Sequence, residues 1–380
     1  MRVLMVAPVF PRQAVDTAGA TLWRLCEGLV ERGHSVKVVA PGGPGEPTAA
    51  TLGRVEVRRV VAAPPLAIAK TIRGMARAVG EECAAGGVNI VHAHGWTPAG
   101  IAAAFARRHG RPLALTLHGA DVRLARRMAG GLLLLAGVAR RATVVSVVTS
   151  DLLDDAARAT RKARESIPVT SMPTLGGEPP APPVGISHGV VYVGRLIARK
   201  GVRYLLDALA LLKKQGLPLD LTVVGDGPER AALKAQALAF GIPTVFTGFV
   251  PPDQVPDYLA GKRVFVLPSI EEGRGLVLVE ALRQGVPVVA TLSGGIPDLL
   301  TEDGAGVLVP PADATALASA IRRVVNDDDY LTGAVNAGRV LLARLSPAAA
   351  AAAFEQLYAD ARGRRTGAQR ASQRSSGSHR

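Results

Sequence analysis

The sequence predicts an α/β fold of two doubly wound domains, each a parallel sheet with helices on both faces. Short runs rich in Val, Leu and Ile alternate with longer segments of helical periodicity, which is typical of parallel sheets with right-handed crossovers. The alternation breaks at residues 168–188, a stretch rich in Pro and Gly, and then restarts. A length of 380 residues also fits two domains.

The elements of the first half follow from local patterns. The helix expected at 17–32 carries apolar residues at helical spacing on one face, and Gly33 ends it. Apolar runs bounded by turn residues are expected to be strands. In order, we expect strand 2–8, helix 17–32, strands 35–40 and 55–61, helix 66–85, strand 89–94, helix 98–109, strand 113–118, a helix from about 123 to 140 and strand 143–149.

The second half repeats the alternation, and helices are expected to fill most of 313–361. Its other expected elements are strand 190–194, helix 201–215, strand 219–225, helix 228–240, strand 244–247, a short helix near 253–259, strand 264–267, helix 276–284, and strands 286–290 and 306–309.

These elements divide the chain into an N-terminal domain at 1–170, a linker at 171–188 and a C-terminal domain at 189–346. A helix at about 347–361 can pack back on the first domain, and the low-complexity basic tail, 362–380, is expected to be disordered. Ligands of doubly wound sheets bind at the carboxyl ends of the strands. We therefore expect the two domains to face each other across a cleft that holds the active site.

Composition excludes several classes of protein. Hydrophobic residues make up 48% of the chain, which excludes wholesale disorder. With only two cysteines, Cys26 and Cys83, neither a disulfide scaffold nor a cysteine-based zinc site is expected. No apolar run is long enough for a transmembrane helix, and the apolar N-terminus lacks a signal-peptide cleavage site. A cytoplasmic protein is therefore expected.

Charge is distributed unevenly along the chain. Residues 1–185 have a net charge of +10, residues 186–361 have −2, and the last 19 residues add six arginines. A basic half indicates an anionic partner, although a general abundance of Arg explains it equally well. The basic residues lack interleaved aromatic residues and belong to no evident nucleic-acid-binding module, so no nucleic-acid partner is expected.

Two basic and apolar stretches, 54–77 and 123–141, are candidates for peripheral contact with the inner face of an anionic membrane. Each Lys or Arg near such a surface adds about 1 kcal/mol to binding. The alternative interpretation of each stretch is a core helix with basic ends.

Polar residues at strand–helix junctions of the second half are candidates for a nucleotide site. Arg195 and Lys200 precede a helix, where they can bind a diphosphate or simply be solvated. The glycines around Gly225 allow close approach of a ligand, or make a tight turn. Glu280 lies in an apolar run, where its carboxylate needs a partner such as the two hydroxyls of a sugar. Glu272 precedes a helix N-terminus, which by itself favours an acid.

A series of segments between about residues 190 and 310 points to a known family: VGRLIARKG, VVGDGPE, FTGFV, PSIEEGRGLVLVEALRQGVPVVAT and SGGIPDLL. In this order and spacing they resemble the C-terminal domain of the retaining GT-B glycosyltransferases, group one (family four). The first half matches more weakly, through the loop at Gly19 and the segments ERGHSVKVV, VHAHGW and LTLHGADV. The resemblance implies two Rossmann-like domains and a hexosyltransferase with a nucleotide-diphosphate sugar donor.

The resemblance also implies roles for individual residues. Arg195 and Lys200 would bind the donor diphosphate, and His118 would lie beside the transferred sugar. Glu272 would contact that sugar, and Glu280 would hold the nucleotide ribose. The other implied donor-binding residues are Gly19 near the phosphates, the backbone of Gly273, Arg274, Gly275 and Leu276, and the base-contacting loops 225–227 and 248–250, which include Gly225 and Val250.

Three positions depart from the family pattern. Arg274 stands where the family usually has a large apolar residue, which bears on the identity of the donor sugar. Asp298 stands where Glu is usual, and residues 169–174 replace the usual Asn-Gly turn before the linker. None of the departures removes a matched catalytic position.

The expected reaction is transfer to an acceptor hydroxyl with retention. Arg195 and Lys200 would stabilise charge on the departing diphosphate in place of a metal ion. No carboxylate is evident where a double-displacement nucleophile would lie, so we expect same-face attack, with the leaving phosphate taking the acceptor proton. The acceptor is expected to be anionic or lipid-linked, because the surplus of basic residues lies in the first half.

Neither a metal nor a cofactor is expected. His92 and His94 lack a third ligand at a recognisable spacing, and the Asp-x-Asp at 327–329 lies between two helices, where a solvated loop or helix cap explains it. A phosphorylase would need a pyridoxal-bearing lysine, which is not evident, and a dehydrogenase would need a G-x-G-x-x-G after the first strand. The alternatives that stay open are a nucleotide-sugar epimerase on the same fold and a non-catalytic nucleotide-binding module.

Overall fold

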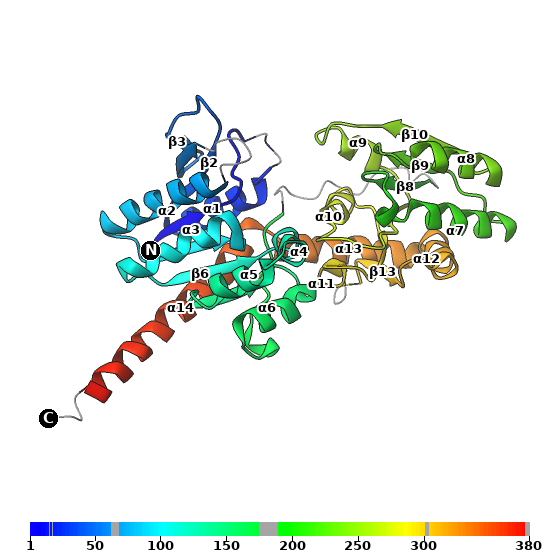
Figure 1. Ribbon diagram of the computed structural model, residues 1–380. Helices are drawn as coiled ribbons and strands as arrows, with labels where there is room; N and C mark the ends of the chain where they lie inside the picture. The colour runs from blue at the N-terminus through cyan, green and yellow to red at the C-terminus, as the bar shows by residue number, and fades with distance from the viewer. Residues whose placement is uncertain (15, 17, 62–67, 175–188, 301–303, 377–380) are drawn as a thin grey trace. The chain divides into compact units, whose positions relative to one another are not determined.

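A computed structural model of the protein shows two compact units (Figure 1). Unit 1 comprises Met1–Gly176 and Leu345–Arg380, and unit 2 comprises Gly177–Arg344. Side chains of residues 364–376 are not described. The structure describes the rest of the chain except residues 15, 17, 62–67, 175–188, 301–303 and 377–380. Most of the predicted linker thus lies outside the described residues.

Unit 1 is built on a seven-stranded sheet with the order β3-β4-β2-β1-β5-β6-β7. All neighbours are parallel except β3 and β4, which are antiparallel. The strand order reverses between β1 and β5, which makes their carboxyl ends the place where a ligand is expected. The strands are β1 (Arg2–Val6), β2 (Ser35–Gly42), β3 (Ala49–Leu52), β4 (Val55–Val61), β5 (Ile90–His94), β6 (Leu113–Leu117) and β7 (Val144–Val147).

The C-terminal helix α14 belongs to unit 1 and packs on α1. The two helices approach so closely that a Cβ added to Gly28 would lie 2.5 Å from the carbonyl oxygen of Pro347. Arg32 and His34 each bind the Glu355 carboxylate at 2.6 Å. The helices of unit 1 are α1 (Ala20–Glu31), α2 (Ile68–Ala84), α3 (Ile101–Ala103), α4 (Gly119–Arg127), α5 (Gly131–Ala139), α6 (Leu153–Thr160) and α14 (Pro347–Ser376), with short helical turns at Trp96–Gly100, Ala104–His109, Ser150–Leu152 and Arg164–Ser166.

Unit 2 has a six-stranded, fully parallel sheet with the order β10-β9-β8-β11-β12-β13, which reverses between β8 and β11. Its strands are β8 (Val190–Val193), β9 (Leu221–Val224), β10 (Thr244–Gly248), β11 (Val264–Leu267), β12 (Val288–Thr291) and β13 (Gly306–Val309). Its helices are α7 (Val202–Lys214), α8 (Arg230–Phe240), α9 (Val255–Leu259), α10 (Leu276–Arg283), α11 (Ile296–Leu300), α12 (Ala314–Asn326) and α13 (Asp328–Arg344), with a helical turn at Ala198–Lys200.

The central strands are buried along their whole length, since every residue of β5, β6, β11 and β12 is buried. A parallel strand covered by helices on both faces needs apolar residues on both, which explains the continuous apolar runs of the sequence. The predicted fold class is confirmed: both units are Rossmann-like layers around a mainly parallel sheet.

The elements of unit 1 differ from the predicted ones in three places. Strand β3 was not expected, because its AATL sequence lacks a strand pattern and pairing with β4 creates it. The helix expected at 123–140 is two helices, α4 and α5, because Gly130 adopts a left-handed conformation with φ 72° between them. The helix expected at 98–109 is a series of short helical turns around α3.

Helix α14 is assigned to Ser376 and so includes most of the tail that the sequence predicts to be disordered. Residues 377–380 lie outside the described part of the chain.

Candidate functional site

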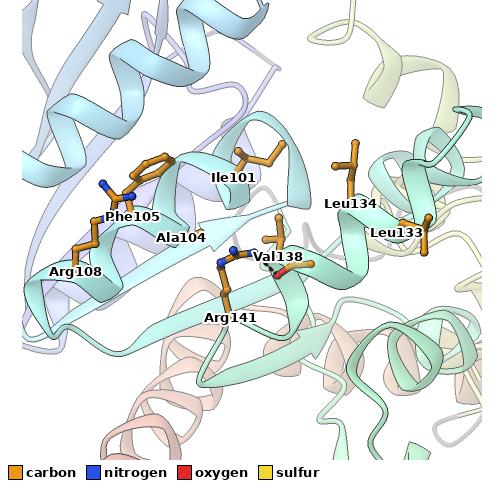
Figure 2. Close-up of a pocket in the computed structure, with 9 residues that line it drawn as sticks. Ile101, Ala104, Phe105, Arg108, Leu133, Leu134, Val138 and Arg141 are labelled. Carbon is orange, nitrogen blue, oxygen red and sulfur yellow. Dashed lines mark hydrogen bonds between the residues drawn. The ribbon is translucent and has the colours of Figure 1, made fainter.

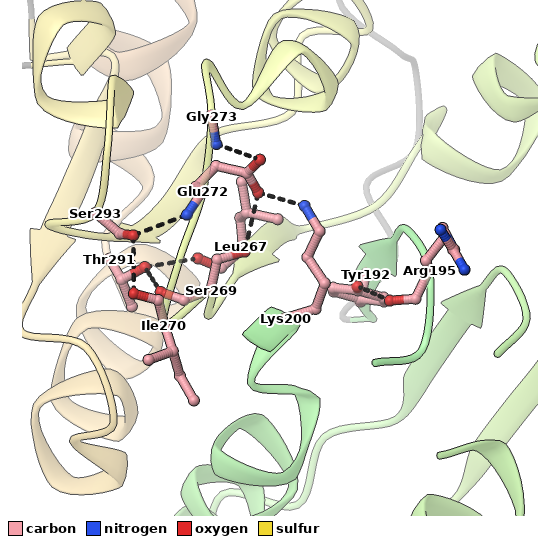
Figure 3. Close-up of polar contacts among 10 residues, drawn as sticks. All are labelled: Tyr192, Arg195, Lys200, Leu267, Ser269, Ile270, Glu272, Gly273, Thr291 and Ser293. Carbon is pink, nitrogen blue, oxygen red and sulfur yellow. Dashed lines mark hydrogen bonds and ion pairs between the residues drawn. The ribbon is translucent and has the colours of Figure 1, made fainter. Parts of the chain in front are cut away.

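Unit 2 brings the loops after β8 and β11 side by side, because these strands pair at the point where the strand order reverses. Lys200 ends the first loop, and Glu272 lies in the second. The Lys200 Nζ is 2.5 Å from Glu272 Oε2, and the two side chains are only 17% and 10% exposed (Figure 3). The structure thus joins two residues that the sequence predicts for the site.

The Glu272 carboxylate is held by further hydrogen bonds. The Ser269 hydroxyl donates to Oε2 at 3.0 Å, and the Gly273 amide donates to Oε1 at 2.9 Å. The Glu272 amide donates to the Ser293 hydroxyl at 3.0 Å. Burial opposes ionisation, but the hydrogen bond and the charge of Lys200, together with the hydrogen bonds from Gly273 and Ser269, outweigh it, so the pKa of Glu272 lies below its ordinary value. The site therefore contains an ionised carboxylate in a fixed orientation.

Backbone contacts hold the same two loops together. The amides of Ile270 and Glu271 donate to the Arg199 carbonyl oxygen at 2.8 and 3.2 Å. Gly201 adopts a left-handed conformation with φ 65°, and a Cβ added there would lie 2.1 Å from the Pro268 carbonyl oxygen. Only glycine allows this approach, which places Lys200 beside the second loop.

We expect Gly201→Ala to lower the free energy of unfolding by at least about 1–2 kcal/mol, the cost of a left-handed residue with a Cβ. Contact with the Pro268 carbonyl adds to this cost. Gly333→Ala is the matched control, because Gly333 lies within α13 and its added Cβ meets no atom within 4 Å. Urea denaturation of both variants measures the effect. Equal stability of the two variants contradicts the close approach.

Arg195 lies in the loop after β8, but Figure 3 shows its side chain pointing away from the Lys200–Glu272 pair. Tyr192 donates a hydrogen bond to the Arg195 carbonyl oxygen at 3.1 Å, which fixes the backbone and not the guanidinium. The Arg195 side chain is exposed and, within the described part of the chain, has no hydrogen bond or ion pair. The structure therefore does not bring Arg195 into contact with the other predicted site residues.

Helix α10 carries the second predicted glutamate. Gly275, with φ 64°, caps the helix, and Leu276 begins it with 43% of its surface exposed. A Cβ added to Gly273 would meet no atom within 4 Å, so there is open space beside this backbone. Burial raises the pKa of Glu280, and nearby Arg283 only partly offsets the effect. Glu280 is therefore a poorly solvated carboxylate on the same helix.

The loops predicted to contact the base touch one another. The Gly225 amide donates to the Gly248 carbonyl oxygen at 2.9 Å, and a Cβ added to Gly225 would lie 2.0 Å from the Gly194 carbonyl oxygen. This loop packing explains why residue 225 is glycine without invoking a ligand. Val250 lies just beyond β10 and is half-buried.

Two of the three departures from the family pattern act on each other. Burial lowers the pKa of Arg274 to about 10, and the negative charge of Asp298 opposes that shift. A buried guanidinium is costly without a nearby anion. Asp298 thus offsets part of the cost of placing Arg274 in this loop.

Unit 1 has a cavity of about 520 Å³ where its strand order reverses, and both predicted residues of this unit, Gly19 and His118, line it. His94 and Asp121 line it as well, and the remaining wall is mainly apolar. Gly19 is left-handed, with φ 82°, and a Cβ there would lie 2.9 Å from the Val9 carbonyl oxygen.

His94 lines this cavity, whereas sequence reasoning considered it only as half of a metal site. Its Nδ1 lies 3.1 Å from Nε2 of His118. Burial lowers the pKa of His94 well below its ordinary value, and His92 and His118 add to the effect, so the ring is neutral. Its buried Nε2 has no hydrogen-bond partner among the described residues. One signal in the sequence could have identified His94. His94 ends a predicted strand, and His118 ends the next predicted strand along the chain.

Asp121 was also missed. Its carboxylate accepts hydrogen bonds from the amides of His118 at 2.9 Å and Trp96 at 3.0 Å, and so joins the loops after β5 and β6. Burial raises its pKa to about 7, against the effect of these hydrogen bonds.

The C-terminal helix contacts the strand that carries His92 and His94. The Tyr358 hydroxyl of α14 lies 2.9 Å from Nδ1 of His92. Helix α14 therefore helps to position His92, whose ring packs against that of His94.

Across the part of the chain that the structure describes, no cluster of three or more His, Cys, Asp or Glu residues is suited to a metal ion. In the same residues, none of the helices combines the length and the apolar character that crossing a membrane requires.

Comparison with known proteins agrees with this arrangement. Residues 187–341 match the family model of glycosyl transferases group 1, and residues 17–173 match that of a glycosyl transferase 4-like domain. A 2-deoxystreptamine N-acetyl-D-glucosaminyltransferase of Streptomyces fradiae is 30% identical, over 86% of this chain and 89% of that protein. The fold and these matches define a protein of the GT-B class, although the chain spans only about 40–60% of the length of several curated relatives that it matches. The chain belongs to the group 1 glycosyltransferases.

Other similarities are more partial or show the fold alone. A 2-deoxystreptamine glucosyltransferase of Streptomyces kanamyceticus is 36% identical, but the match spans only 40% of each chain. Sucrose-phosphate synthase from Thermosynechococcus elongatus has a TM-score of 0.71 and 23% identity, covering 94% of this chain and 98% of its own. Anabaena HepE, solved in complex with UDP, has a TM-score of 0.70 and 20% identity, covering 94% and 100%.

Proposed function

We propose that the protein transfers a glycosyl group from a nucleotide-diphosphate sugar to an acceptor hydroxyl, with retention of configuration and without a metal ion. The observation that supports this proposal best is the Lys200–Glu272 pair, a cation and an ionised carboxylate beside open backbone at Gly273. A departing diphosphate needs preorganised positive charge, and the hydroxyls of a sugar donate to a carboxylate.

Each residue has a defined part in this reaction. The acceptor oxygen bonds to the anomeric carbon on the face from which the diphosphate departs, and a phosphate oxygen takes the acceptor proton. Lys200 and Arg195 stabilise the charge that develops on the diphosphate. Glu272 orients the donor sugar, and Glu280 accepts hydrogen bonds from the ribose hydroxyls.

The donor must compete with Glu272 for Lys200, because the two side chains are paired in the donor-free protein. When the diphosphate recruits the ammonium group, Glu272 keeps the hydrogen bonds of Ser269 and Gly273 and can accept bonds from the sugar. Arg195 is exposed and is not paired with Glu272, so the diphosphate can bind it without first breaking an ion pair.

For the acceptor we propose an anionic or lipid-linked molecule. Residues 1–185, which include most of unit 1, have a net charge of +10, and the cavity at His94 and His118 has a mainly apolar wall. A basic unit favours an anionic partner, and an apolar wall favours an acceptor with apolar parts.

A panel of nucleotide sugars tests the donor and the reaction. UDP sugars come first, since HepE was solved with UDP, and release of nucleoside diphosphate is followed without acceptor and with 2-deoxystreptamine or a phospholipid acceptor. NMR of the product should show the anomeric configuration of the donor. An epimerase would change the donor sugar without releasing nucleotide, and a binding module would bind nucleotide without turnover; either result contradicts the proposal.

We expect donor turnover to persist in excess EDTA. The only Asp-x-Asp motif in the sequence lies at 327–329, where Asp327 accepts the Tyr330 amide at 2.8 Å and the intervening Asp328 pairs with Arg263 at 2.5 Å. The measurement compares initial rates with EDTA and with added Mn²⁺. Complete loss of activity in EDTA and its recovery with Mn²⁺ would show that a metal takes part.

A further inference from the structure

The structure distinguishes between the two basic and apolar stretches, which the sequence alone makes equally good candidates for membrane contact. In the first stretch, 54–77, Arg54 binds Glu27 and Glu31, and Arg58 binds Glu81 and Glu82. Arg59 is 8% exposed and donates to the backbone carbonyls of residues 10 and 11. Half of the basic side chains in this stretch are therefore neutralised or buried, which leaves the second stretch, 123–141, as the stronger candidate.

Helix α5, in the second stretch, is apolar on both faces. Gly131, Leu135, Val138 and Ala139 face the core at helical spacing. On the other side Leu132, Leu133 and Leu134 are 49%, 76% and 51% exposed. Exposed apolar side chains that are contiguous mark an interaction surface more often than isolated ones do.

A pocket of about 360 Å³ continues this apolar surface beside α5. Ile101, Phe105, Leu133, Leu134 and Val138 line it, together with two arginines, Arg108 and Arg141 (Figure 2). The arginines lie toward one end of the pocket and the two leucines toward the other. The Arg108 guanidinium lies 5.1 Å from the Phe105 ring centroid, and Arg141 donates to the Gly137 carbonyl oxygen at 3.2 Å.

None of the residues that line this pocket is acidic. Residues 83–150 contain eight arginines and a single acid, Asp121, whose carboxylate accepts backbone hydrogen bonds beside the cavity at His118. Of the eight arginines, Arg126 pairs with the buried Asp155 from a neighbouring helix. The surface thus combines exposed leucines with a surplus of positive charge.

We propose that the α5 surface, defined as Phe105, Arg108, Leu132, Leu133, Leu134 and Arg141, docks on a bilayer that contains anionic lipids. The leucines enter the interface, and the two guanidinium groups bind lipid phosphates, which is how basic and apolar helices bind membrane surfaces. A second copy of the chain is a poor occupant, because pairing two such surfaces would bring their arginines together. The proposal does not depend on the identity of the acceptor.

Co-sedimentation with vesicles of phosphatidylcholine, with and without phosphatidylglycerol, tests this surface. All variants are made in the full chain with the tail arginines 364, 365, 370, 374 and 380 changed to Gln, so that the tail cannot dominate binding. This parent protein should bind only vesicles that contain phosphatidylglycerol, and salt should release it.

R108Q/R141Q should weaken binding by about 10–30-fold, since each basic residue contributes about 1 kcal/mol. L133Q/L134Q should weaken it by about tenfold, because partial burial of two leucines is lost. The matched controls are K70Q/R73Q on α2, in the first stretch, and L238Q, an 83% exposed leucine of α8 in unit 2; both should bind like the parent.

Binding that is absent in the parent, or that falls in K70Q/R73Q but not in the α5 variants, overturns the proposal. Donor hydrolysis in the same samples without vesicles should be unchanged in all variants, because none of these residues lies in the donor site. If the protein binds vesicles but hydrolyses no donor, the proposed function is refuted, whereas the proposal that the α5 surface binds membranes is supported.

Discussion

Arg195→Ala and Lys200→Ala should each lower kcat by about 10²–10³-fold, the range seen when one group that stabilises transition-state charge is removed. Charge builds on the departing diphosphate, and these are the two cations assigned to it. The rates are measured at saturating donor, so that weaker binding does not contribute. Near-full turnover of either variant would refute its role at the diphosphate.

The two variants should differ in stability. Lys200→Ala leaves the largely buried Glu272 without its counter-ion, which we expect to cost up to about 3 kcal/mol. Arg195→Ala removes an exposed side chain and should unfold like the parent, so it is the cleaner test of catalysis. Arg199→Ala is the matched control, because Arg199 is an exposed arginine of the same loop that contributes only its carbonyl to the loop contacts. It should retain near-full activity.

Glu280→Gln and Glu272→Gln should affect different steps. Glu280→Gln should weaken binding of the bare nucleoside diphosphate by about 5–30-fold, roughly 1–2 kcal/mol, because a charge-assisted bond to ribose becomes a neutral one. Glu272→Gln should leave that affinity nearly intact and lower turnover, because Glu272 would contact only the sugar. Calorimetry with the bare nucleotide separates the two. An equal loss of nucleotide affinity in both variants contradicts this division.

The same two variants should shift the melting temperature of the donor-free protein in opposite directions at neutral pH. Burial raises the pKa of Glu280, so its ionised form destabilises the fold, and Gln mimics the protonated form that folds better. The pKa of Glu272 is lowered, so its stabilisation is present above the unfolded-state pKa and is lost as pH falls through the folded-state pKa. Glu272→Gln should therefore melt lower at neutral pH and lose this acid dependence.

Sequence reasoning selected Lys200 and Glu272 as candidate donor-site residues, and the structure joins them. Lys200 and Glu272 carry local signals, because each lies in a strand–helix loop with a recognisable motif, and their loops follow strands that pair. His94, Asp121 and Ser293 were missed as site residues, since their roles arise from contacts with residues 21 to 25 positions away along the chain. Nothing in a short window distinguishes such residues from ordinary strand ends and turns.

The sequence by itself determined the two α/β units, the order along the chain of all their strands except β3, and the loops of the candidate donor site, because hydrophobic periodicity, glycines and prolines act over a few neighbouring residues. Tertiary structure decided what depends on packing between distant segments. It paired Lys200 with Glu272 and left Arg195 exposed. It also neutralised Arg54 and Arg58 while leaving Leu133 and Leu134 exposed, because the partner of a charge and the cover of an apolar face come from elsewhere in the chain.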